Sequence, residues 1–196
     1  ISTKQTGGAI DIRSGKSKHL NSGGIVLRSV SQNLIGSSGR VQINTGDSVS
    51  TSGDIELKAG SSLGGAGGRV DIQGGNGHNK GGSVRIAAGF ASSSTGGIVN
   101  IMSGGSTGKE SGGVFIRTGE SHRLTGNIQV NTGNSKGGNS GALFFKTGNA
   151  FGGESGSITV STGSSFADDT GTISVKAGIT ASSDNRGGNV NVYGGN

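Results

Sequence analysis

The chain has 196 residues, of which 44 are Gly, and it contains no Pro, Cys or Trp. Hydrophobic residues make up 28% and aromatic residues 4%, too few for the core of a conventional globular domain of this length. Without Cys there is no disulfide framework and no thiolate chemistry, and the formal net charge of +6 favours anionic partners. The composition is typical of disorder, but disordered chains usually contain Pro. Its absence instead favours a chain whose backbone amides donate to a ladder.

A repeat of about 15 residues organises the chain from end to end. Each repeat begins at a Gly, counted here as offset 0, and continues into an alternating apolar segment. There are 13 repeats, with spacings of 14 to 17 residues. The starting glycines are Gly8, Gly23, Gly39, Gly53, Gly68, Gly82, Gly97, Gly112, Gly126, Gly141, Gly156, Gly171 and Gly188.

Offsets 2 and 4 are apolar in all 13 repeats and are mostly β-branched. Alternation of this kind is typical of a strand with one buried face. We therefore expect these side chains to point inward and to stack into a core ladder. Its clearest members are Ile10, Ile12, Val41, Ile43, Val114, Ile116, Ile158 and Val160.

The residues after each apolar segment are small. Offset 6 is always Ser, Thr, Ala or Gly, and by parity it also points inward. Offset 7 is Gly in every repeat except one, where Val30 stands, and we expect this Gly to turn the chain, because Gly accepts the positive φ of a sharp corner. Offset 9 is also small except at Gln32, which predicts that the returning half of the repeat lies close to the first half.

Identical segments that recur in one phase are most simply parallel. The sequence therefore predicts an all-β fold, a parallel β-solenoid of about 13 coils with a 15-residue repeat, in which residues 1–196 form a single continuous segment. Ile1 and Asn196 fall at the same offset, and neither end carries a capping helix, a polar outlier repeat or Pro. We expect the segment to belong to a longer repetitive chain or to join end to end with further copies.

No constellation of residues predicts catalysis, a metal site or a cofactor. The three His residues lie in repeats three or four coils apart, too far to share a metal. Glu56 and Asp71 occupy offset 3 of neighbouring repeats, the spacing of a carboxylate pair that acts on glycosides or holds a cation. Lys58, Arg69 and Arg85 lie nearby and favour neutralised surface charge instead. We expect no enzyme and no cofactor.

The outward offset 5 carries six basic residues and no acid. We interpret them as a column for anionic polysaccharide, mineral or a neighbouring filament; the alternative is that they confer solubility and discourage lateral aggregation. Nucleic acid is disfavoured because the aromatic residues that stack bases are nearly absent. No apolar run reaches the roughly 18 residues that span a bilayer. The column consists of Arg13, Arg28, Lys58, Arg117, Lys146 and Lys176.

The repeat Gly-Gly-x-(Ile/Val)-x-(Ile/Val)-x-(Ser/Thr/Ala)-Gly, as in residues 112–119, resembles the very long Gly/Ser/Thr-rich repeat proteins predicted in diatoms and other microalgae. Bacterial surface adhesins converge on similar residues. The resemblance implies an extracellular or wall-associated structural protein with no catalytic residues.

The leading hypothesis from the sequence is a structural segment, a shaft or filament at a cell surface or in extracellular matrix. The alternative is an adhesin-type rod that binds anionic polysaccharide or mineral. Ice binding is a further alternative, and it requires an outward array of Thr in register. Five threonines instead occupy offset 6, which parity turns inward: Thr45, Thr118, Thr132, Thr147 and Thr162.

Overall fold

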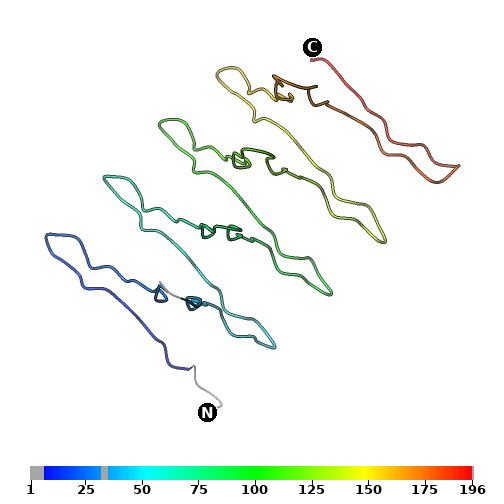
Figure 1. The fold of residues 1–196 in the computed structure, drawn as a ribbon. Coiled ribbons are helices and arrows are strands. Elements are labelled where there is room, and N and C mark those ends of the chain that lie inside the picture. The colour runs from blue at the N-terminus through cyan, green and yellow to red at the C-terminus, as the bar shows by residue number, and fades with distance from the viewer. Residues whose placement is uncertain (1–6, 32–34, 196) are drawn as a thin grey trace. The chain divides into compact units, whose positions relative to one another are not determined.

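The computed structural model describes residues 7–31 and 35–195. Within these residues there is no helix and no strand, and the trace runs as long stretches joined by tight turns (Figure 1). The predicted parallel β-solenoid of 13 coils is therefore wrong, and the described chain is a coil. The chain divides into two units, Ile1–Asn100 and Ile101–Asn196, and both contain the repeat.

The ladder expected between neighbouring segments is missing. A folded chain makes roughly one internal hydrogen bond per residue, most of them between backbone groups. Across the described residues there are six backbone-to-backbone hydrogen bonds, and each joins one Gly to another within a single loop. The amides and carbonyls of the alternating segments are thus left to water, because no parallel neighbour is paired with them.

The core expected at offsets 2 and 4 is missing as well. No described residue is buried, and the chain exposes 20,843 Å² of surface. A compact monomer of 19.1 kDa exposes roughly 8,400 Å². The side chains predicted to form the core ladder are instead between 47% and 92% exposed. They are Ile10, Ile12, Val41, Ile43, Val114, Ile116, Ile158 and Val160.

The composition supplies the physical reason for this outcome. Gly loses more backbone freedom on folding than any other residue, and this chain has 44 of them. Each repeat offers only two regularly placed large apolar side chains against that entropic cost. A single repeat therefore cannot hold its neighbours in register by apolar contact alone.

The alternation still has a structural consequence. Val114 at offset 2 is 51% exposed, whereas Phe115 at the next position is 86% exposed. The same contrast separates Leu143, at 50%, from Phe144, at 85%. In these two repeats the offset-2 side chain is thus less exposed than its offset-3 neighbour, although water reaches both.

The regular local structure of this chain is a loop closed by two glycines, which we call the Gly-clasped loop. The amide of the Gly at offset 0 donates to the carbonyl of the offset-7 Gly of the preceding repeat, at 2.8 to 3.0 Å. Six loops of the described residues are closed in this way. The pairs, donor first, are Gly23 with Gly15, Gly68 with Gly60, Gly82 with Gly75, Gly97 with Gly89, Gly112 with Gly104, and Gly188 with Gly178.

The small residue at offset 6 packs against the neck of its loop. A Cβ built on Gly112 would lie 3.5 Å from Cβ of Ser103, and one built on Gly156 would lie 3.6 Å from Cγ2 of Thr147. Ser103 and Thr147 are half-buried, as expected from this position. The five threonines at offset 6 make the same contact with the Gly that follows, so their methyl groups face the loop neck, which argues against an outward ice-binding array.

The residue at offset 9 has a role that differs from the one expected. Every Ser or Thr there accepts a hydrogen bond from a backbone amide two or three residues further on, at 2.9 to 3.5 Å. Such hydroxyl-capped turns fold the tip of the loop. The acceptors are Ser17, Ser48, Ser62, Ser106, Ser121, Ser135, Ser165 and Thr180.

The offset-7 glycines do not turn the chain through a positive φ. Among the described residues only Gly36 has one, at 136°. Gly36 lies in the repeat where Val30 replaces the offset-7 Gly, and a β-branched residue does not adopt positive φ without strain. In six other repeats the offset-7 Gly instead contributes the carbonyl that accepts the loop-closing bond. Gln32 lies outside the described residues.

We expect dilute solutions of this chain to show no cooperative thermal unfolding. A two-state transition requires a core that melts as a unit, and none of the described side chains is buried. Far-UV circular dichroism followed from 10 to 90 °C checks this, and a gradual change without a sigmoidal step is the expected record. A sharp transition at low micromolar concentration would contradict the absence of a core.

Candidate functional surface

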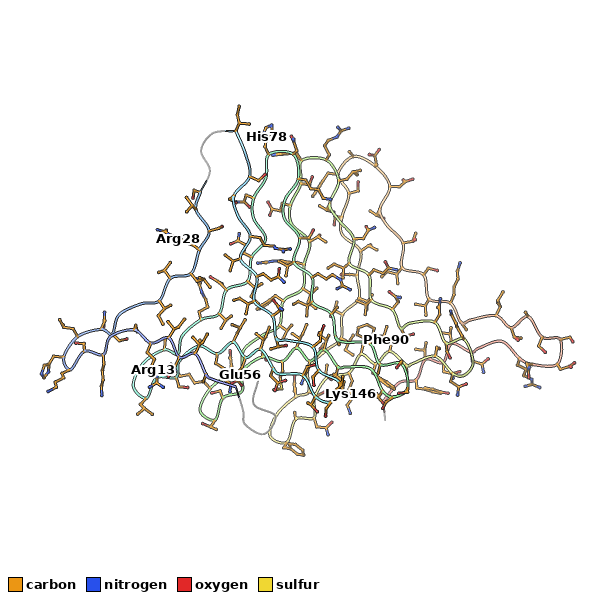
Figure 2. The ribbon with its side chains drawn as sticks, turned by 90° about the horizontal axis from the view of Figure 1, so that it is seen from below. Arg13, Arg28, Glu56, His78, Phe90 and Lys146 are labelled. Carbon is orange, nitrogen blue, oxygen red and sulfur yellow. The ribbon has the colours of Figure 1, made fainter. Side chains whose placement is uncertain are left out.

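The six basic residues predicted at offset 5 are all exposed, and two of them already have partners. Arg13 forms an ion pair with Asp11, and its Nε donates to Oδ1 of that residue at 2.9 Å. The Lys58 Nζ lies 2.6 Å from Oε1 of Glu56. Arg13, Glu56 and Lys146 are labelled along the trace in Figure 2. The positive charge of Arg13 and Lys58 is therefore largely neutralised within their own segments.

The other four cations have no carboxylate partner among the described residues. They are Arg28, Arg117, Lys146 and Lys176. The residues at offset 3 in their repeats are Val26, Phe115, Phe144 and Ser174, so the position that supplies an acid in the paired repeats is uncharged here. The structure thus divides the six predicted cations into two that are paired with a carboxylate and four that are not. The spacing of the residues did not predict this division.

The neighbouring carboxylates Glu56 and Asp71 are each paired with a cation of their own segment. Asp71 Oδ2 lies 2.6 Å from a guanidinium nitrogen of Arg69, just as Glu56 contacts Lys58. Both pairs are exposed and join residues two apart, and exposed pairs contribute about 0 to 1 kcal/mol. This arrangement matches charge neutralisation at the surface, and it offers no pair of carboxylates for acid–base chemistry.

Other kinds of site are not formed by the described residues. No three side chains among His, Cys, Asp and Glu in residues 7–31 and 35–195 come close enough to hold a metal ion. The surface hollows are lined by runs of consecutive residues, such as Glu120, Ser121 and His122, and are bends of one segment. In the same part of the chain no helix is long and apolar enough to cross a membrane.

Sequence reasoning missed the large apolar residues at the loop tips. They fall at offsets 8, 10 or 12, so no fixed period reveals them, and their exposed fractions run from 85% to 110%. Figure 2 shows one of them, Phe90, among the labelled side chains. The members in the described residues are Leu20, Ile35, Val49, Leu63, Phe90, Leu124, Phe151, Phe166 and Ile179.

Comparison with known proteins finds no matching protein family, no similar curated protein and no similar solved structure. The resemblance to microalgal repeat proteins therefore stays a prediction from the residues of the repeat.

Proposed function

We propose that this chain is a structural segment of an extracellular or cell-surface material, and that it acts by associating with further copies of itself. The observation that carries the proposal is the recurrence of an apolar pair, at offsets 2 and 4, in all 13 repeats without burial of any member in the described residues. A chain that presents the same unsatisfied surface at every repeat is suited to lengthwise assembly.

Two kinds of group are available for association in each alternating segment. One is the row of backbone amides and carbonyls that have no partner in the described chain. The other is the pair of exposed apolar side chains, as at Val114 and Ile116, which are 51% and 73% exposed. When one extended segment pairs with another, backbone hydrogen bonds supply affinity and the alternate side chains fix the register. A second copy offers both at the matching spacing.

The Gly-clasped loops give the assembly its spacing. Six of the loops are closed by a short backbone bond, as between Gly112 and Gly104, so these successive segments are joined by loops of similar length. Copies can therefore meet in several registers that differ by whole repeats. Association in several registers suits a structural material, because copies can add lengthwise and sideways without one fixed alignment.

The composition of the chain supports an extracellular setting. Chains rich in Gly, Ser and Thr suit hydrated material, and the hydroxyls at the loop tips are exposed to water. Binding of an anionic polymer is a second candidate function, favoured by the cations that have no carboxylate partner among the described residues.

A concentration series of the whole chain tests the proposal. We expect sedimentation and light scattering to show monomers at low micromolar concentration and growing assemblies above a threshold, with a sheet-type circular dichroism signal that appears only with assembly. Electron microscopy of the assembled material should show filaments or bundles. A chain that stays monomeric up to millimolar concentration at physiological salt would rule out the proposed self-association.

A further inference from the structure

The available cations of residues 101–196 follow a double repeat. Offset 5 carries Arg117, Lys146 and Lys176, which lie 29 and 30 residues apart, and the repeats between them carry the uncharged Asn131 and Ser161. One cation therefore recurs at every second repeat through this unit. Charges that served only solubility would not need to recur at every second repeat.

Acidic residues are excluded from the same segments. The five alternating segments between residues 112 and 177 contain no Asp or Glu, and the acids of this unit lie in its loops, as Glu120 and Glu154 do. In residues 101–196 no described carboxylate lies within ion-pair distance of Arg117, Lys146 or Lys176. These cations thus keep their full charge for a partner outside the chain.

An exposed aromatic ring stands two residues before two of these cations. Phe115 and Phe144 are 86% and 85% exposed. Side chains two apart in an extended segment share one side, about 6.5 to 7 Å apart. In another repeat the offset-3 residue Glu56 contacts the offset-5 residue Lys58. Side chains at these two offsets can therefore touch the same bound molecule.

The Phe115 ring leans away from the cation. A Cβ added to Gly113 would lie 3.0 Å from Cε2 and 3.1 Å from Cζ of the ring, so the ring lies over Gly113. The Gly at offset 1 leaves room for this pose, and the Arg117 guanidinium is not covered by the ring of its own segment. The Phe115 ring and the Arg117 guanidinium can therefore each contact a bound molecule separately.

We infer that the Phe115–Arg117 and Phe144–Lys146 pairs, with Lys176, bind a linear acidic polysaccharide. The cation meets a carboxylate or sulfate, and the ring meets the apolar face of an adjoining sugar. Each contact is weak because it is exposed, and affinity arises from several contacts along one polymer. Nucleic acid is disfavoured because aromatic residues that stack bases make up only 4% of the chain. This inference rests on the second candidate function proposed above, binding of an anionic polymer, and is tested separately from self-association.

The test measures binding of the whole chain, below its assembly threshold, to polygalacturonate, dextran sulfate and neutral dextran. The variant R117Q/K146Q/K176Q should lose on the order of ten-fold in affinity for both acidic polymers, with a shallower salt dependence. The matched control K109Q/R123Q/K136Q removes the same charge from loops of the same unit and should lose less than about two-fold. Neutral dextran should not bind.

A second variant isolates the rings. F115S/F144S keeps every charge and should weaken binding to polygalacturonate about three-fold, because the sugar loses its apolar contact. Equal losses in the two charge variants would overturn the inference, since net charge alone would then explain binding. Wild-type affinity in the ring variant, or tighter binding to single-stranded oligothymidylate than to polygalacturonate, would overturn the choice of polysaccharide.

Discussion

Replacing the apolar pairs of three successive repeats by Ser is expected to abolish assembly of the chain. The variant changes six side chains at offsets 2 and 4, each of which would become buried against a second copy. Full burial of such a side chain contributes about 1.5 to 3 kcal/mol, and these begin 50% to 73% exposed, so the threshold concentration should rise by at least roughly a thousand-fold. The positions are Val114, Ile116, Ile128, Val130, Leu143 and Phe145.

The control removes the same number of large apolar residues from the loop tips. These residues are more exposed than the ones above, from 88% to 109%, but they do not alternate. If the alternating segments drive association, the control assembles at nearly the wild-type threshold. Should the control lose assembly to the same extent, general hydrophobic attraction would be the cause. Its positions are Leu63, Phe90, Leu124, Phe151, Phe166 and Ile179.

Gly74→Ala is expected to open the loop that the Gly82 amide closes. An added Cβ on Gly74 would meet the carbonyl oxygen of Gly82 closer than atoms can approach, and the Gly82 carbonyl carbon at 2.9 Å. The crowded atoms are backbone, so the loop neck has to shift. The bond from the Gly82 amide to the Gly75 carbonyl, 2.8 Å long, should be lost with it.

The adjacent Gly75 supplies the control, because a Cβ there would meet nothing within 4 Å. In amide hydrogen exchange measured by NMR, the Gly82 amide should be protected about two- to ten-fold in the wild type and in Gly75→Ala, and unprotected in Gly74→Ala. The Gly97 amide, in another clasped loop, serves as an internal reference. A Gly82 amide that is unprotected in the wild type would show that the clasp does not form in solution, and equal protection in both variants would show that Gly74→Ala does not open it.

The local features of this chain were the most predictable from sequence. The repeat phase is visible in the structure, since the half-buried residues of the described chain all fall at offset 6 or 9, as Ser103 and Ala91 do. The ion pair of Glu56 with Lys58 shows that offsets 3 and 5 lie on the same side of their segment, as residues two apart in an extended chain do. Such features depend on residues near one another in the chain, and the spacing of side chains along an extended backbone determines them.

The details of the loops needed the structure. The sequence marks Gly at offset 7, but the atoms that matter are its carbonyl and the amide of the next offset-0 Gly, as in Gly104 with Gly112. Likewise, small size at offset 9 did not reveal that Ser106 caps its turn through two backbone amides. Which cations stay available depends on side-chain placement, and only the structure pairs Arg13 with Asp11.

By itself the sequence determined the repeat and its alternation, because these are properties of residue type and spacing. It did not determine whether the segments pair. Pairing depends on a balance between the entropy lost in ordering a Gly-rich chain and the free energy that packing against neighbouring segments contributes, and that balance is set by tertiary structure. Alternating residues such as Val114 and Ile116 are compatible with a buried ladder and with an exposed coil alike. In the described chain they are exposed, because no neighbouring segment covers them.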